Sequence, residues 1–178
     1  MRPDGTARRV VAEGVRNSVG FAWHPDTQQL WFTDNGRDWL GDELPSCELN
    51  RVTRDGEHFG FPFVHGKATH DPDYFALAER ADFTPPAFEL GPHVAPLGLL
   101  FYTGAQFPPD YRNALLVAEH GSWNRSRKNG YRVVRMVLDA HGNVLREEPF
   151  LSGFLEGEQV AGRPVAFLQL ADGSVLLS

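Results

Sequence analysis

Short apolar runs rich in aromatic and β-branched residues alternate with polar turn segments along most of the chain. Proline and aspartate begin the first of these segments, Pro25–Gln29, and both are typical of turns. Because the flanking runs are only a few residues long, the pattern predicts antiparallel strand pairs rather than helices. The expected strand pairs occupy residues 21–24 with 30–33, 97–103 with 114–118, 131–138 with 144–146, and 165–170 with 175–177.

Three of these pairs resemble one repeated unit. The second strand ends in a polar cluster at residues 33–36 (Thr-Asp-Asn-Gly) and again at 118–121 (Ala-Glu-His-Gly). The last pair reaches Ser178, where such a cluster would begin. Repeated multi-strand units with polar strand ends are typical of propeller blades, whose inner strands line a central channel. The sequence therefore predicts an all-β protein, with a β-propeller as the fold and a β-sandwich as the alternative.

Helical structure is expected at one place only. Residues 72–81 begin with a proline, which suits the first turn of a helix, and are long enough for two turns. The 18 glycines and 13 prolines favour turns elsewhere. No linker or low-complexity tract divides the chain, so we expect one domain over residues 1–178.

Composition narrows the function classes. Lys and Arg number 17 against 23 Asp and Glu, and the resulting net charge of −6 argues against nucleic-acid binding. Cys47 is the single cysteine, which excludes an intrachain disulfide. No apolar run is long enough to cross a bilayer, and the first residues have no apolar signal core.

Two polar segments are candidates for ligand binding. Arg16 and Asn17 precede the first predicted strand, and a guanidinium pairs bidentately with carboxylates. Residues 33–43, followed by Glu48 and Asn50, are dense in oxygen donors and glycines, as a hard cation requires. Their spacing does not match a helix-loop-helix calcium loop, and a solvated polar loop is the alternative.

A third candidate follows the second polar cluster. His120 closes an apolar strand, and the nearby basic stretch Arg125–Lys128 would attract a small anionic ligand. A charged hairpin end is the alternative for this stretch. Ser122 lacks the Gly-x-Ser-x-Gly setting of a hydrolase nucleophile.

Taken together, these segments resemble the glucose/sorbosone dehydrogenase family, and within it the L-sorbosone dehydrogenase-like or soluble aldose dehydrogenases. The resemblance implies a six-bladed β-propeller, of which this chain holds about three blades. It implies pyrroloquinoline quinone (PQQ) and Ca²⁺ as cofactors, an aldose or a sugar aldehyde such as sorbosone as substrate, a separate electron acceptor, and a periplasmic or secreted location. The resemblance runs from about residue 8 to the end and rests on residues 14–25, 30–38, 48–52, 58–62, 93–97, 118–126 and 162–165.

The resemblance also implies roles for individual residues. Backbone carbonyl groups of Gly36 and Arg37 would bind the calcium beside the cofactor, where it polarises the quinone carbonyl. Glu48 and the Phe59 carbonyl would bind a second, structural calcium. The residues implied to contact the cofactor are Arg16, Asn17, Asn35, Val94, Arg125 and Arg163.

The sequence departs from the family pattern at the catalytic base. The family has a histidine base many residues before the Arg-Asn pair, whereas only 15 residues precede Arg16 here and none is histidine. We therefore assign no catalytic residue, and expect a partial domain without the N-terminal blades and the closing strand. Such a chain is expected to have no dehydrogenase activity by itself.

Two functions of other classes remain open. One is a propeller that only binds ligands, in which Arg16, Asn17 and Glu119 pack the channel. The other is a calcium-dependent sugar lactone hydrolase, to which Asp34, Asn35 and Glu119 would supply oxygen ligands.

Overall fold

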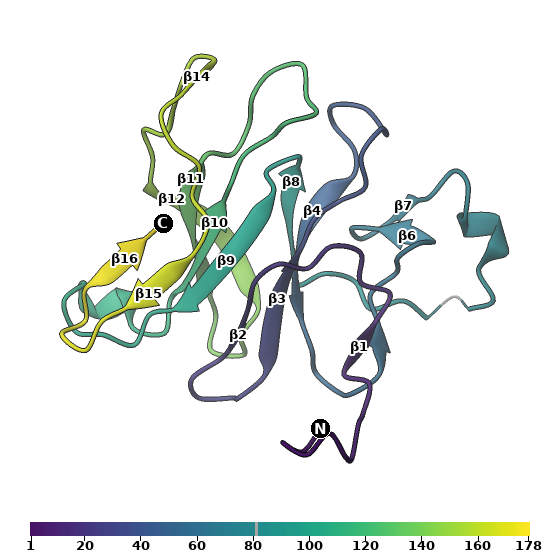
Figure 1. The fold of residues 1–178 in the computed structure, drawn as a ribbon, viewed down its shortest axis with the longest axis horizontal. Helices are drawn as coiled ribbons and strands as arrows, with labels where there is room; N and C mark the ends of the chain where they lie inside the picture. The colour runs from purple at the N-terminus through teal and green to yellow at the C-terminus, as the bar shows by residue number, and fades with distance from the viewer. Residues whose placement is uncertain (81) are drawn as a thin grey trace.

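Two four-stranded antiparallel sheets form the body of the protein, seen side by side in the computed structural model (Figure 1), which describes residues 1–80 and 82–178. A further two-stranded hairpin follows the second sheet. The first sheet contains, in order, β2 (Phe21–Trp23), β3 (Leu30–Asp34), β4 (Ser46–Arg51) and β8 (Phe88–Pro92). The second contains β9 (Pro96–Phe101), β10 (Leu115–Glu119), β11 (Arg132–Leu138) and β12 (Val144–Leu151), and the hairpin contains β15 (Phe167–Gln169) and β16 (Val175–Leu177).

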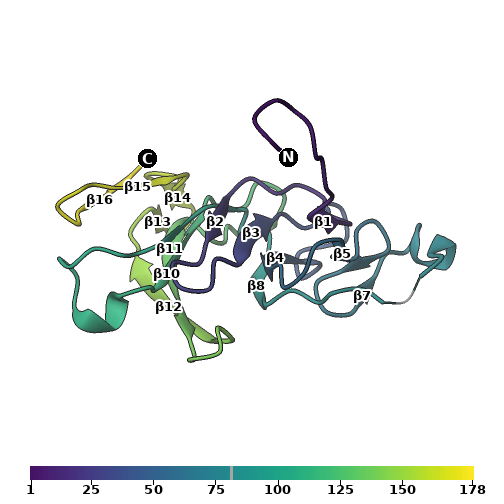
Figure 2. The same cartoon turned by 90° about the horizontal axis from the view of Figure 1, so that it is seen from below.

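The remaining strands are two-residue elements at the margins. Figure 2 shows the β15–β16 hairpin and the β6–β7 hairpin at opposite ends of the molecule, with the two large sheets between them. β1 pairs in parallel with β5, whereas β6–β7 and β13–β14 are antiparallel. These strands are β1 (Ala12–Glu13), β5 (Glu57–His58), β6 (Val64–His65), β7 (Thr69–His70), β13 (Leu155–Glu156) and β14 (Gln159–Val160).

The helix expected over residues 72–81 is wrong for the described part of that segment, and Ala81 lies outside the described residues. A single 3₁₀ turn, η1 (Phe75–Leu77), forms instead. The Asp71 carboxylate accepts the backbone N–H groups of Asp73 and Tyr74, which favours a tight local turn over helix propagation. A second 3₁₀ turn, η2 (Pro109–Tyr111), lies between β9 and β10.

All four predicted strand pairs form. Polar turns close the hairpins as expected: in the β2–β3 turn, the backbone N–H of His24 donates to the Gln29 carbonyl at 2.9 Å. The central strands β3, β4 and β10 are buried along most of their length, so both of their faces are covered, whereas β12 at the outer edge is largely exposed. Trp31 of β3 meets Phe101 of β9 edge to face, with 5.9 Å between ring centroids, in a core shared by both sheets.

Inner strands β2, β9 and β15 lie next to one another because glycines allow a close approach. A Cβ atom on Gly20 would lie 2.1 Å from the Leu97 carbonyl oxygen, and one on Gly98 would lie 2.6 Å from that of Val165. Gly98 also donates its N–H to the Val165 carbonyl at 2.8 Å. The same contact thus repeats from sheet to sheet, as in the packing of successive propeller blades.

Candidate functional site

A pocket of about 230 Å³ opens where β3 ends and the loops before β2 and β9 meet. Its walls come from both large sheets, although its residues are distant in sequence. Ala95, Leu97 and Trp123 contribute from the second sheet and its loops. The pocket brings together five of the ten predicted site residues: Arg16, Asn17, Asn35, Gly36 and Arg37.

Asp34 anchors the Arg16–Asn17 segment. Its buried carboxylate accepts the backbone N–H of Arg16 at 2.9 Å and that of Asn17 at 2.6 Å. Burial raises the pKa of Asp34, although these hydrogen bonds and the Arg16 charge act in the opposite direction. Because both oxygens are occupied by the backbone, Asp34 positions the segment rather than facing a ligand.

Arg16 and Asn35 both line the pocket. Arg16 donates to the Asn35 carbonyl at 3.1 Å and lies 3.5 Å from an Asp38 carboxylate oxygen. Asn35 donates its amide hydrogens to the carbonyls of Asn17 (3.1 Å) and Pro96 (3.2 Å). These contacts hold both side chains in place while leaving the loosely paired guanidinium for an anionic group.

Gly36 and Arg37 also line the pocket. No described residue donates a hydrogen bond to either carbonyl. The Arg37 side chain is engaged elsewhere, because its guanidinium pairs with Asp71 and Asp73. Burial alone would raise the pKa of Asp71, but hydrogen bonds from Arg37 and His65 hold it well below its usual range. Carbonyl oxygens that accept no hydrogen bond from a described residue are suitable ligands for a hard cation.

Glu48 lies in a separate buried site on β4. It accepts the Gly66 N–H at 2.7 Å and the Asn50 amide at 2.9 Å, and burial raises the pKa of Glu48 to about 7. The Asn50 Oδ1 atom is buried with no hydrogen-bond partner among the described residues. A buried carboxylate beside an unpaired amide oxygen fits the ligand set of Ca²⁺. The Phe59 ring packs against Phe32, with 5.0 Å between centroids, in a small second core.

Three predicted cofactor contacts are outside the lining of the pocket. Val94 is buried, and its carbonyl accepts the Gly121 N–H at 2.9 Å. The Arg125 guanidinium binds the Asp42 carbonyl at 3.1 Å and the Glu43 carboxylate at 2.6 Å. Arg163 donates to the carbonyls of His120 (3.1 Å) and Gly121 (2.6 Å).

Arg163 nevertheless occupies a position that repeats through the blades. Asn35 contacts the Pro96 carbonyl from the end of β3, and His120 contacts the Pro164 carbonyl from the end of β10, at 3.2 Å in each case. Asn17, Ala95 and Arg163 therefore stand at equivalent places, each just before an inner strand. The shared order of an apolar residue followed by Gly or Ala, at 19–20, 97–98 and 165–166, is a sequence signal that would have revealed this repeat.

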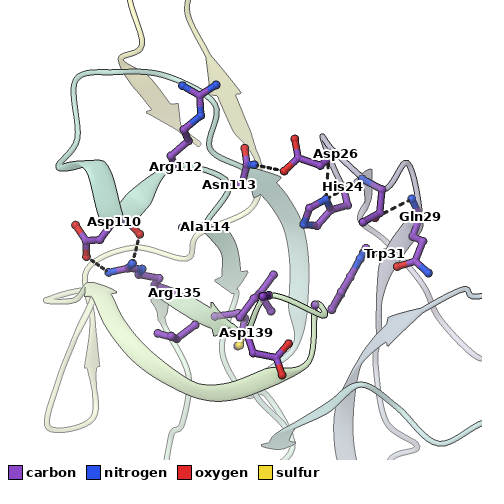
Figure 3. Close-up of a pocket in the computed structure, with 16 residues that line it drawn as sticks. His24, Asp26, Gln29, Trp31, Asp110, Arg112, Asn113, Ala114, Arg135 and Asp139 are labelled. Atoms are coloured by element: carbon purple, nitrogen blue, oxygen red, sulfur yellow. Dashed lines mark hydrogen bonds and ion pairs between the residues drawn. The ribbon is translucent and has the colours of Figure 1, made fainter.

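A larger cavity of about 410 Å³ lies at the opposite end of the blades, around the β2–β3 and β11–β12 turns (Figure 3). None of the predicted site residues lines it. Its charged and amide groups pair with one another: Asn113 donates to Asp26 at 2.6 Å, and Arg135 donates to Asp110 at 2.9 Å. The Asn113–Asp26 pair joins the two sheets, whereas the Arg135–Asp110 pair lies within the second, so we interpret the cavity as part of the interface between blades.

Among residues 1–80 and 82–178, no three His, Cys, Asp or Glu side chains converge on a common point. Within the same residues, no helix has the length and apolar character needed to cross a bilayer.

Comparisons with known proteins agree with this geometry. A protein of Borreliella burgdorferi, described only as uncharacterized, is 45% identical over 172 residues, which cover 95% of this chain and 45% of that protein. The holo form of the pyranose dehydrogenase PQQ domain from Coprinopsis cinerea has a TM-score of 0.69 at 21% identity, covering 96% of this chain and 53% of the other. A putative oxidoreductase (glucose dehydrogenase) from Thermus thermophilus has a TM-score of 0.66 at 26% identity, covering 98% and 44%.

The structural likenesses confirm the predicted β-propeller fold. The chain spans only about half the length of these proteins. A family model described as Glucose / Sorbosone dehydrogenase matches residues 2–160, most of the sequence. The chain therefore belongs to the glucose/sorbosone dehydrogenase family.

Proposed function

We propose that this chain carries the cofactor-binding side of a quinoprotein sugar dehydrogenase. The full reaction would oxidise an aldose, or a sugar aldehyde such as sorbosone, with pyrroloquinoline quinone and Ca²⁺. The observation that carries this proposal is that one pocket is lined by Arg16, Asn17, Asn35, Gly36 and Arg37. The carbonyls of Gly36 and Arg37 accept no hydrogen bond from a described residue. The likeness to a holo PQQ domain supports it.

Each group in the pocket has a chemical role in this proposal. The bound quinone supplies a hydride acceptor for the sugar carbon. Arg16, which lies 3.5 Å from Asp38, would bind a carboxylate of the cofactor. Asn17 and Asn35 would orient the same ligand, and the Gly36 and Arg37 carbonyls would hold the cation that accompanies it. Val94, Arg125 and Arg163 do not line the pocket, and their hydrogen bonds would hold neighbouring loops and strands in place.

Glu48 is proposed to hold a second, structural Ca²⁺. Its buried carboxylate and the unpaired Asn50 Oδ1 are oxygen ligands, and the Phe59 carbonyl is the further ligand proposed for this site. A cation here would favour the ionised form of Glu48 and link β4 to the adjoining loops.

No catalytic base is assigned among the pocket residues. His93 lines the pocket, but its Nε2 atom lies 2.7 Å from the Gly41 carbonyl oxygen and is engaged there. A base is required to take the proton of the sugar hydroxyl, so we propose that the complete protein provides it from another segment. By family, we propose a periplasmic or secreted protein that passes electrons to a separate acceptor.

The lactone hydrolase alternative is less well supported. Asp34 binds two backbone N–H groups, and Glu119 pairs with Arg132 at 2.7 Å. Neither carboxylate is thus left for a catalytic metal. The other alternative, a propeller that only binds ligands, would have no affinity for quinone. The following experiment measures that affinity.

The proposal is tested by titrating the purified 178-residue chain with pyrroloquinoline quinone and following its absorbance, with Ca²⁺ or with EDTA. We expect saturable binding that requires Ca²⁺. Substitution Arg16→Ala should weaken it about tenfold or more, because a charged hydrogen bond is worth roughly 1.5–3 kcal/mol. Arg112→Ala, at an exposed arginine beside the opposite cavity, is the matched control and should leave binding unchanged. No spectral change at any quinone concentration would contradict the proposal.

A further inference from the structure

Two exposed tryptophans stand at the mouth of the candidate pocket. The side chain of Trp39 is 76% exposed and that of Trp123 is 67% exposed. Their rings meet edge to face, with 6.0 Å between centroids and 88° between planes. Two large apolar rings that touch each other and still face solvent are unusual on a protein surface and indicate a binding surface.

We propose that Trp39 and Trp123 form a platform that binds a sugar ring at the mouth of the pocket. This platform adds a substrate-binding site outside the cofactor pocket. It rests on the proposed function in one respect, which is that the bound sugar is the substrate.

The platform is built from two different blades. Trp39 lies in the loop between β3 and β4, and Trp123 lies in the loop between β10 and β11. Both loops extend beyond the same end of the sheets, at the top of Figure 1. Trp123 lines the pocket and Trp39 does not, so the pair spans from the pocket wall outward.

Hydrogen bonds between the two loops hold the rings in position. The Arg125 guanidinium binds the Asp42 carbonyl at 3.1 Å and the Glu43 carboxylate at 2.6 Å. Ser126 donates its backbone N–H to the Asp42 carboxylate at 3.1 Å. From the connection between β8 and β9, His93 Nε2 lies 2.7 Å from the Gly41 carbonyl oxygen. This network fixes the loops before any ligand arrives, which lowers the entropic cost of binding.

The backbone of Trp39 is also held in an unfavourable conformation. Its φ angle is +70°, in the left-handed region that bulky residues rarely adopt. Such strain persists only where surrounding contacts impose it, and it concentrates at ligand sites. The loop therefore presents the Trp39 ring outward at a conformational cost.

The chemistry of the site favours a sugar over a purely apolar ligand. Indole faces pack against the C–H groups of a sugar ring, and nearby polar groups bind its hydroxyls. Asp38, adjacent to Trp39, presents a partly buried carboxylate loosely held by Arg16 at 3.5 Å. The pocket of about 230 Å³ is smaller than a typical ligand site, and Trp123 is in its lining, so a ligand larger than the pocket would extend toward the two tryptophans.

NMR of the ¹⁵N-labelled chain tests the proposal, since its four tryptophans each give one indole N–H signal. The probes are glucose and the disaccharide maltose, added without quinone and then with quinone and Ca²⁺. We expect both sugars to shift the signals of Trp39 and Trp123, while those of buried Trp31 and distant Trp23 stay in place. Maltose should bind more tightly, because its second ring extends over Trp39.

Two single substitutions and one control complete the experiment. Trp39→Ala and Trp123→Ala should each weaken sugar affinity about tenfold with little change in Tm, because exposed side chains contribute little to folding. Trp23→Ala is the matched control: this ring is 54% exposed, pairs edge to face with Phe21, and should leave sugar affinity unchanged.

The outcomes separate this proposal from the function on which it rests. Sugar binding that depends on both rings in a chain without quinone affinity supports the platform and contradicts the dehydrogenase proposal. Quinone binding with no sugar-induced shift, or with shifts unaffected by both substitutions, overturns the platform. Shifts caused by a protein electron acceptor but by neither sugar would overturn it too.

Discussion

Buried carboxylates have different roles at neighbouring strand ends. Asp34 closes β3 and binds the backbone of the Arg16–Asn17 segment, whereas Glu119 closes β10 and pairs with Arg132 across to β11. The two residues occupy matching places in the repeat. Asp34 holds a backbone segment in place beside the pocket, and Glu119 joins two strands within a blade.

The acids Glu48 and Glu119 predict how stability depends on pH. Burial raises the pKa of each to about 7, above the value of 4.5 for an exposed glutamate. The folded chain therefore holds these protons more tightly than the unfolded chain does. Their stabilising contribution is fully present below about pH 4.5 and is lost as the pH rises through about 7.

We therefore expect the free energy of unfolding, measured by urea denaturation without Ca²⁺, to increase as the pH falls from about 8 to about 5. Each unit of pKa difference corresponds to about 1.4 kcal/mol. Glu48→Gln and Glu119→Gln should each flatten the profile. Added Ca²⁺ should reduce the contribution of Glu48 specifically, because a cation favours its ionised form. A profile that falls over this range on acidification would be inconsistent with the two raised pKa values.

At the scale of elements, inner-strand glycines set the distance between blades. β9 approaches β15 so closely that a side chain on Gly98 has no room, and β2 approaches β9 at Gly20 in the same way. The third inner strand has Ala166 at the matching position. A methyl group therefore occurs at this position only just before β15, beside which no further described inner strand packs.

Substituting Gly98→Ala is expected to destabilise the chain by about 1–3 kcal/mol, because the added Cβ atom meets the Val165 carbonyl at 2.6 Å. Thermal unfolding followed by circular dichroism measures the change. The reverse exchange at the matching position, Ala166→Gly, is the control and should cost no more than about 1 kcal/mol. An unchanged Tm in Gly98→Ala would show that the blades separate without penalty.

On the scale of the whole molecule, two apolar faces of the blades have no partner within the described part of this chain. On β2, Phe21 and Trp23 are 62% and 54% exposed. On the terminal hairpin, Leu168 and Leu176 are directly paired across the strands and are 58% and 54% exposed. In a propeller, such faces pack against the adjoining blade.

The isolated 178-residue chain is consequently expected to self-associate as its concentration rises. Sedimentation velocity should detect oligomers, and the double substitution Trp23→Glu with Leu176→Glu should shift them toward monomer by placing charge on both faces. Leu77→Glu, at a 65% exposed leucine of η1, is the matched control and should change nothing. A monomer at every concentration would contradict this expectation.

The local sequence pattern was sufficient to predict the hairpins. It was insufficient to predict which strands distant in sequence pair with one another. β2 and β3 follow from their apolar residues and the Pro25–Gln29 turn, which act over a few positions. The pairing of β4 with β8 joins residues about 40 positions apart, and no periodicity in the sequence encodes it. The expected helix after residue 71 failed for a related reason: the Asp71 carboxylate caps a tight turn while bound to Arg37 and His65.

The sequence alone determined the alternation of strands and turns, the repeated polar strand ends and the family resemblance, because each depends on neighbouring residues or on motif order. The fold decided which of those strand ends meet. Arg16, Asn17, Asn35, Gly36 and Arg37 share a pocket, while Arg125 instead joins two loops over 80 positions apart. Burial, pairing and pKa depend on what lies close in space, so only the folded chain separates a residue that faces a ligand from one that holds the site together.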